Sequence, residues 1–369
     1  MDGPRTLVEH FSAIADPGID RAKRHVLIDV IVVAIIGTIC GADGWEDIEM
    51  IATEKEDWLR SFLRLPNGIP SHDTIARTFA RISPQAFNSC FVAWTNDVAN
   101  LTAGEVVAID GKTLRRSFDR AADKAAIHMV SAWASGNGLV LGQLKVDAKT
   151  NEITAIPKLL DLLSISGCIV TIDAMGCQKA IATKVLEKDA DYVLGLKANQ
   201  NDTLDAVKFY FDTCTPAQDS ARQTTDGGHG RIEVRNYRVA DAVLVSGLAE
   251  WPGCRSIVEV HCQREQQGQT TVETRYYLSS LAPDAKTLAH AIRSHWSIEN
   301  SLHWVLDVEF DEDRNRIRTA SAPENLAVLR HLAINLLRKE KTFRGGTGKK
   351  RLKCCLSNQY PEKVLAGAV

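Results

Sequence analysis

Two short β-branched runs, each ending in an aspartate, constrain the fold of this chain more than any other feature. The first run, EVVAID, ends at Asp110, and the second, CIVTID, ends at Asp173. Continuous apolar runs of this length predict strands that are buried on both faces of a sheet. A carboxylate at the end of such a strand costs desolvation free energy unless something compensates it. Each aspartate could simply cap the following turn, but two at the ends of neighbouring strands indicate a shared site.

The segments around these runs alternate between strand and helix. We expect strands at 105–110, 125–135, 139–146, 168–173 and 191–196, and helices at 150–163 and 178–188. Three antiparallel strands, a helix, and then parallel strands alternating with helices form the ribonuclease H-like layout. Its first and fourth strands are adjacent, which would bring Asp110 and Asp173 together. Two carboxylates so close repel each other unless divalent cations such as Mg²⁺ lie between them.

A helical N-terminal domain is expected over residues 1–98. The apolar run 26–40 contains Asp29 and is shorter than the roughly 20 residues of a membrane span, so it predicts a buried helix and no membrane partner. In the segment after it, Ser71 is a good N-cap, and Arg77 and Arg81 lie off the apolar face. This pattern fits a helix-turn-helix that reads DNA ends, or an ordinary helical subdomain with solvated arginines.

The remaining segments predict a catalytic domain at 104–340 with a β insertion at about 220–283. Strands are expected at 231–239, 256–264 and 270–279, and helices at 284–295, 297–308 and 323–339. The segment 338–353 has eight basic residues and one acidic residue, which indicates a flexible, solvated start to a basic tail at 341–369.

Composition limits the class of protein. The 44 Lys and Arg against 46 Asp and Glu give a net charge of −2, which excludes a uniformly basic nucleic-acid-coating protein but allows local basic patches. The nine cysteines include no CxxC pair, and the N-terminus does not read as a signal peptide. We therefore expect a cytoplasmic protein.

A third carboxylate is expected from a helix that crosses the edge of the sheet. Glu299 is the candidate, and His295, Glu299, His303 and Asp307 are spaced by four, so they share one helix face. An exposed polar stripe would give the same spacing, and so would a zinc site, although the HExxH order is missing. Asp307 and Glu309 are alternatives for the third ligand.

Four blocks of sequence resemble a known family: DGKTLRRS, TIDAMGCQ, HGRIEVR and HWSIENSLHWVLDVEFDED. They are similar to the DDE transposases of bacterial insertion sequences, in the ISAs-type group of H-repeat-associated proteins, and the resemblance covers nearly the whole chain. It implies an α/β, retroviral-integrase-like core and the triad Asp110, Asp173 and Glu299. The chain departs from the Tyr-Arg-Glu-Lys signature of related transposases, because His295 and Leu306 stand at the Arg and Lys positions.

The resemblance also implies an activity. A DDE transposase cuts the terminal repeats of its element and joins them to target DNA, with two Mg²⁺ ions on the triad, which Mn²⁺ can replace. It implies a homodimer on double-stranded DNA in the bacterial nucleoid. Candidate DNA contacts are Lys112, Arg115, Arg116, Lys197, Arg231, Arg235, Arg77 and Arg81. Two alternatives stay open: a plain metal-dependent nuclease, and an inactive relic that only binds DNA.

Overall fold

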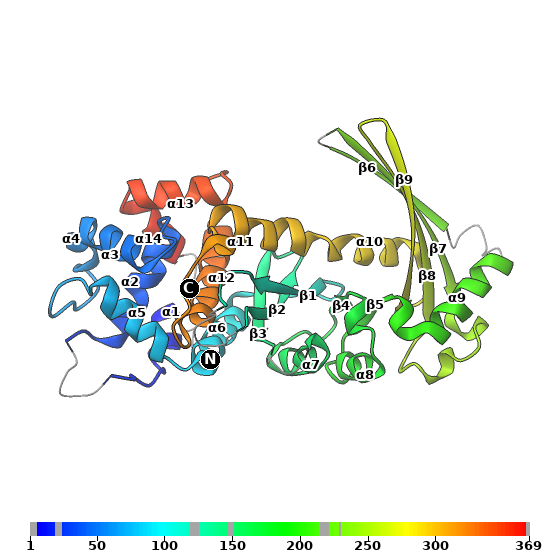
Figure 1. Cartoon of the computed structure of the whole chain (residues 1–369), viewed down its shortest axis with the longest axis horizontal. Helices are drawn as coiled ribbons and strands as arrows, with labels where there is room; N and C mark the ends of the chain where they lie inside the picture. The colour runs from blue at the N-terminus through cyan, green and yellow to red at the C-terminus, as the bar shows by residue number, and fades with distance from the viewer. Residues whose placement is uncertain are drawn as a thin grey trace.

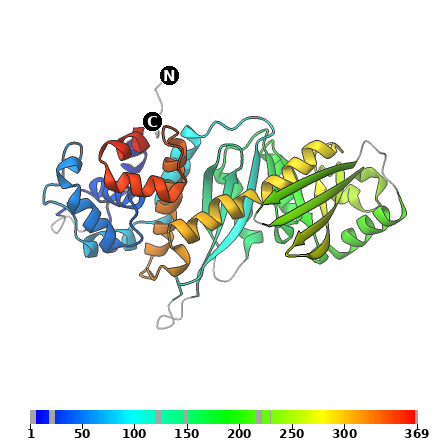
Figure 2. The ribbon, with the colours of Figure 1, turned by 90° about the horizontal axis from the view of Figure 1, so that it is seen from above.

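The structure is a computed structural model that describes residues 6–18, 24–118, 125–146, 151–214, 221–228 and 230–366. Within these ranges the chain has a mixed α/β fold with one large sheet in the strand order β3-β2-β1-β4-β5-β9-β8-β7-β6. Helices gather beyond the β3 edge of the sheet, and the last four strands rise from its other end (Figures 1 and 2).

The first half of the sheet has the expected order and directions. Its strands are β1 (Val106–Leu114), β2 (Ile127–Ala134), β3 (Leu139–Lys145), β4 (Ile169–Ile172) and β5 (Asp191–Leu196). β1 is antiparallel to β2 and parallel to β4, which is parallel to β5. One expectation is wrong: β1 does not end at Asp110, because β2 continues to pair with it as far as Leu114.

The alternation of side chains along the strands decides which face of the sheet carries the aspartates. Val107 and Ile109 lie in the core formed with α7 (Glu152–Leu162) and α8 (Lys179–Glu187). Val106 and Ile169 instead pack against α10 (Ala285–His295) on the opposite face. Asp110 lies four residues after Val106 and Asp173 four after Ile169, so both fall on the α10 face.

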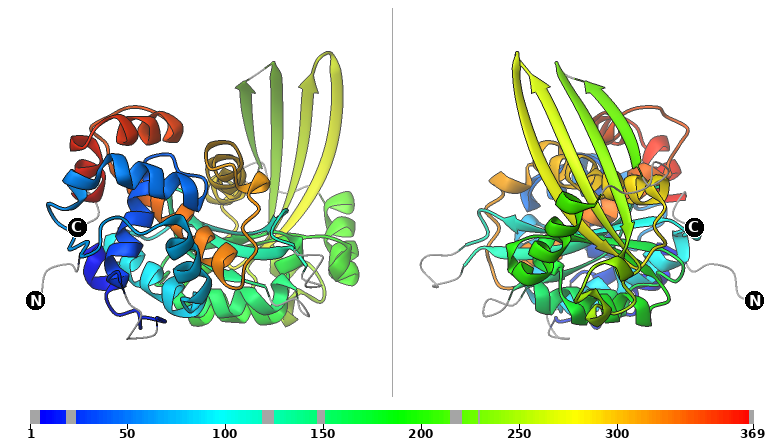
Figure 3. Two further views of the ribbon diagram at one scale, coloured as in Figure 1. Left: turned by 60° about the vertical axis from the view of Figure 1, so that its left-hand side comes forward. Right: turned by 90° about the vertical axis from the view of Figure 1, so that its right-hand side faces the viewer.

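The predicted β insertion is not a separate unit, because it continues the same sheet. Its strands are β6 (Ala221–Gly228), β7 (Arg231–Asp241), β8 (Ser256–Gln266) and β9 (Gln269–Ser279), and β9 pairs with β5. The four strands stand away from the body of the molecule (Figure 3). β6 was not predicted, because its sequence ARQTTDGG is polar and lies almost wholly exposed.

Helices from both ends of the chain share one hydrophobic core. The N-terminal ones are α1 (Leu7–Phe11), α2 (Leu27–Ile39), α3 (Trp45–Glu54), α4 (Glu56–Leu59), α5 (His72–Arg81) and α6 (Pro84–Val98). The long apolar run forms α2, which is buried as predicted. Among the described residues, no helix has the length and apolar character needed to cross a membrane.

The C-terminal helices complete this core. They are α11 (Trp304–Glu309), α12 (Ala322–Lys339), α13 (Thr347–Leu356) and α14 (Gln359–Ala366), while α9 (Asn201–Thr213) lies beside the far end of the sheet (Figure 1). Lys350 and Arg351 are buried in α13. The expectation of a flexible, solvated segment at 338–353 is therefore wrong.

Candidate active site

A cavity of about 310 Å³ lies on the α10 face of the sheet, and all three predicted carboxylates line it. Asp110 comes from β1, Asp173 directly follows β4, and Glu299 follows α10. The pairing of Ile109 with Ile172 brings Asp110 and Asp173 to corresponding positions on neighbouring parallel strands. Lys197, which follows β5, also lines this cavity.

Glu299 reaches this cavity because α10 crosses the sheet and then changes its winding. Leu288 and Ile292 hold α10 on the sheet, and His295 Nδ1 lies 3.0 Å from Thr171 Oγ1 on β4. A regular helix was expected at 297–308, but residues Glu299–His303 form a π-helical turn before α11 begins. Such turns are rare and frequently occur at functional sites.

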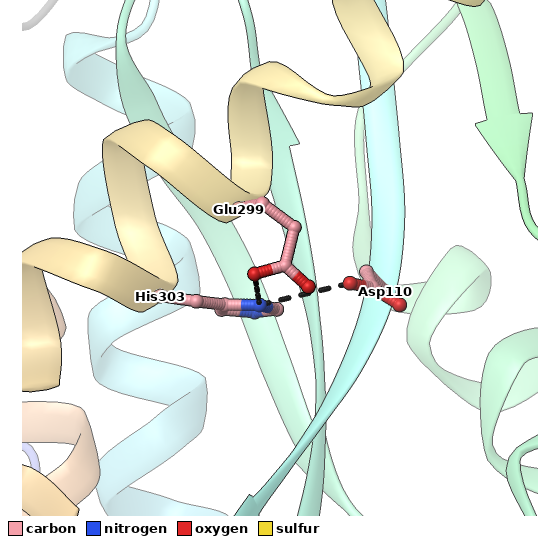
Figure 4. A group of neighbouring side chains, drawn as sticks. All are labelled: Asp110, Glu299 and His303. Atoms are coloured by element: carbon pink, nitrogen blue, oxygen red, sulfur yellow. Dashed lines mark ion pairs between the residues drawn. The ribbon is translucent and has the colours of Figure 1, made fainter. Parts of the chain in front are cut away.

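The polar residues spaced by four do not form an exposed stripe. His295 bonds to Thr171, and Asp307 lies 2.5 Å from Lys112 Nζ. The Nδ1 atom of His303 faces both Asp110 and Glu299 (Figure 4). His295 and Asp307 therefore have partners away from the group that His303 and Glu299 form with Asp110.

Two residues that line the cavity, Asp110 and Glu299, form a close group with His303. His303 Nδ1 is 3.6 Å from Asp110 Oδ2 and 3.6 Å from Glu299 Oε2, and one donor atom from each of the three lies within 4.8 Å of the others. Asp173 is exposed on the cavity wall outside this group, and its Oδ1 accepts the Met175 and Gly176 N–H groups. Asp173 therefore caps the following turn and also faces the site.

Burial controls the charge on Asp110. Burial raises the pKa of Asp110 to about 6, with the Glu299 and Asp173 charges adding to the rise and His303 and the Gly111 N–H opposing it. The neighbouring His303 lowers the pKa of Glu299. A bound cation would favour the ionised form of Asp110, and carboxylate oxygens are ligands that Mg²⁺ and Mn²⁺ accept.

Lys112 does not lie where the sequence suggested. Its Nζ is 2.8 Å from Glu312 Oε2 and 2.5 Å from Asp307 Oδ1, and Glu312 Oε1 is 3.4 Å from Arg330 NH1. Burial alone would lower the pKa of Lys112, but these carboxylates raise it. Lys112 therefore ties β1 to the helix after Glu299, and the expectation that it contacts phosphate is not supported.

Five other predicted DNA contacts lie near the sheet. Arg115, Arg116 and Lys197 are exposed, and Arg115 forms an ion pair of 3.2 Å with Asp313. Arg231 is partly exposed beside Glu233. Arg235 differs from the expectation, because its side chain is only 12% exposed and is paired with Glu233 and Asp226.

Arg77 and Arg81 lie exposed on α5 and line a groove of about 600 Å³ in the helical domain, together with Arg24.

The sequence did not predict Glu312 and Arg330, which are buried: Glu312 pairs with Lys112, and Arg330 pairs with Glu312. Glu312 lies in an acidic run and Arg330 in a long helix, and neither position carries a signal for such a pairing.

Comparison with known proteins gives one matching family for each of the two parts of the chain. The family described as "Transposase DDE domain" matches residues 102–336, and the family described as "DDE_Tnp_1-associated" matches residues 8–95. A cryo-EM structure of a piggyBac transposase synaptic complex with hairpin DNA is 13% identical and covers 96% of this chain and 76% of that chain, with a TM-score of 0.43. That likeness is too weak to carry an argument.

Bacterial relatives match over almost the full length. "Putative transposase YncI" of Escherichia coli O157:H7 is 42% identical over 98% of this chain and 95% of its own length. "H repeat-associated putative transposase YhhI" of Escherichia coli (strain K12) is 40% identical over 99% of this chain and 98% of its own length. The chain belongs to the DDE transposase family, in the group of H-repeat-associated transposases.

Proposed function

We propose that this chain cuts DNA strands at the ends of an insertion sequence and transfers them into target DNA. The observation that carries the proposal is the convergence of Asp110, Asp173 and Glu299 on one cavity from three separate elements. Membership of the DDE transposase family supports the same chemistry. The strand order β3-β2-β1-β4-β5 supports a ribonuclease H-like core, with β6 to β9 as its insertion.

We propose that Asp110, Asp173 and Glu299 hold two Mg²⁺ ions, which Mn²⁺ can replace. When bound, such ions supply activation of an attacking hydroxyl and stabilisation of the leaving oxygen. The protein contributes three oxygen ligands on a rigid sheet and helix. The burial of Asp110 favours a bound cation, because His303 and the Gly111 N–H offset only part of the cost of its lost hydration.

DNA binding in this proposal comes from local cations, since the whole chain is almost neutral. Exposed Lys197, Arg115 and Arg116 would contact phosphates near the cavity, Arg231 would do so from the β insertion, and Arg77 and Arg81 from the groove in the helical domain. A homodimer would hold two terminal repeats at once. Binding should weaken steeply with salt, because each phosphate contact releases counterions.

The test is cleavage of a labelled duplex that carries the element's own terminal repeat, with wild type and Asp173→Ala compared in Mg²⁺. We expect nicking at the repeat boundary in wild type and its loss in Asp173→Ala, with DNA binding retained. Equal cleavage by both proteins would remove Asp173 from the site. Lys179→Ala, which changes an exposed residue of α8, is the matched control.

Two outcomes correspond to the other functions that the sequence allows. Nicking without joining of the 3′-hydroxyl end to a second duplex would indicate a plain nuclease. Specific binding without cleavage in Mg²⁺ or Mn²⁺ would indicate an inactive relic.

A further inference from the structure

His303 is a buried histidine that faces the candidate active site and has no role in the triad. Its side chain is only 6% exposed, yet its Nδ1 lies 3.6 Å from an oxygen of Asp110 and 3.6 Å from an oxygen of Glu299 (Figure 4). Both distances exceed that of a good hydrogen bond. The three donor atoms therefore surround a common point without being tightly bonded to one another.

No hydrogen bond from the other ring nitrogen fixes His303 in this position. Nε2 is buried and makes no hydrogen bond to any residue that the structure describes. The nitrogen that faces the two carboxylates is Nδ1. The π-helical turn from Glu299 to His303 places the two side chains together on the side of the helix that faces β1.

We propose that His303 is a protein ligand of one ion in this site, together with Asp110 and Glu299, and that this position prefers Mn²⁺ to Mg²⁺. The inference rests on the proposed function, because it adds a ligand to the same metal site. Adjacent ligands bonded at about 2.1 Å to one ion lie about 3.0 Å apart, so small side-chain movements would complete the set.

The preference follows from the chemistry of the donors. Mg²⁺ takes hard oxygen ligands and loses its water reluctantly, whereas Mn²⁺, a first-row transition-metal ion, accepts an imidazole nitrogen more readily than Mg²⁺ does. Replacing one oxygen by Nδ1 of His303 therefore lowers the relative affinity for Mg²⁺. Asp173, which lies on the cavity wall outside the close group, remains available to a second ion with oxygen ligands only.

The test measures metal binding to the full chain without DNA. Mn²⁺ and Mg²⁺ affinities are obtained by calorimetry for wild type, His303→Ala and His303→Asn, and pulsed electron paramagnetic resonance detects nitrogen bound to Mn²⁺. We expect nitrogen coupling in wild type and its loss in both variants. Mn²⁺ affinity should fall about tenfold or more, while Mg²⁺ affinity changes about twofold or less. His290→Ala, at an exposed histidine on α10, is the matched control.

The outcomes separate this inference from the proposed function. Mn²⁺ binding that depends on Asp110 but shows no nitrogen coupling in wild type would overturn the role of His303 and leave the triad intact. Wild type that binds no Mn²⁺, or binds it equally after Asp110→Asn, would overturn both. If the His303 variants do not fold, replacing the histidine nitrogens by ¹⁵N in wild type and in His295→Ala still reports whether Mn²⁺ has a histidine ligand other than His295.

Discussion

At the scale of single residues, Asp110 shows how a functional side chain can oppose stability. It follows four buried residues of β1, and burial raises its pKa to about 6 from an ordinary value of 3.8. Between these two pH values the folded protein binds more protons than the unfolded chain, so stability falls as the pH rises through this range. Above pH 6 the full penalty of the buried charge is present.

Asp110→Asn should therefore stabilise the metal-free protein. The rise in the pKa of Asp110 corresponds to a loss of about 3 kcal/mol in the free energy of unfolding at neutral pH. The stability gained by the substitution should therefore shrink as the pH falls below about 6. Urea unfolding in the presence of a chelator, from about pH 5 to about pH 8, measures the difference in the free energy of unfolding between wild type and variant. Asp57→Asn, at an exposed position, should have almost no effect. A wild type as stable as Asp110→Asn near pH 8 would contradict the argument.

At the scale of elements, α12 connects parts of the fold that are far apart in the sequence. Near its start, Asn325 Nδ2 donates to the Phe79 carbonyl of α5 at 2.7 Å. Further along, Asn335 Oδ1 accepts the Val140 N–H at 2.8 Å, and Asn335 Nδ2 donates to the Val140 carbonyl at 2.8 Å. β3 is an edge strand with unpaired backbone groups, and Asn335 satisfies two of them.

Asn335→Ala should lower the free energy of unfolding by about 3 kcal/mol, because two buried backbone groups lose their partner. Chemical denaturation measures the change. Asn201→Ala, at an exposed asparagine of α9, is the matched control and should cost about 0.5 kcal/mol or less. A loss of the same small size for Asn335→Ala would mean that this edge of the sheet does not depend on α12.

At the scale of the whole molecule, the C-terminal segment is part of the core that the N-terminal helices form. Arg351 donates to the carbonyls of Ala42 at 2.9 Å and Thr38 at 3.2 Å and to that of Glu309, and it pairs with Asp43 at 3.0 Å. Its guanidinium group also lies 4.1 Å from the centre of the Phe310 ring. At this position of the basic segment, the charged side chain of Arg351 therefore stabilises the core.

Arg351→Ala should destabilise the protein by about 3 kcal/mol, because it leaves buried carbonyls and Asp43 without their donor. Lys349→Ala, at an exposed position of the same helix, should change stability by about 0.5 kcal/mol or less. Thermal unfolding of both variants gives the comparison. If Arg351→Ala were neutral for stability but weakened DNA binding, the segment would be a DNA-contacting tail after all.

The sequence by itself determined the elements whose pattern is local. Apolar runs predicted β1, β4 and β5, and the ends of two of these runs predicted Asp110 and Asp173 as site residues. The N-cap Ser71 and the apolar face that follows it predicted α5. Each of these signals lies within a few residues, so the chain carries it without reference to the fold. β6 was not predicted from the sequence, because an exposed edge strand needs no apolar pattern.

Only the tertiary structure decided which charged and polar groups meet. Lys112 and Glu312 are 200 positions apart, and Arg351 and Thr38 are 313 apart, yet each pair is in contact. The identity of a side chain does not reveal a partner at such a distance, because the sheet order and the path of α10 to α13 bring the two together. For the same reason, Lys112 was predicted to be free for a phosphate, and His303 is seen beside Asp110 only in the folded chain.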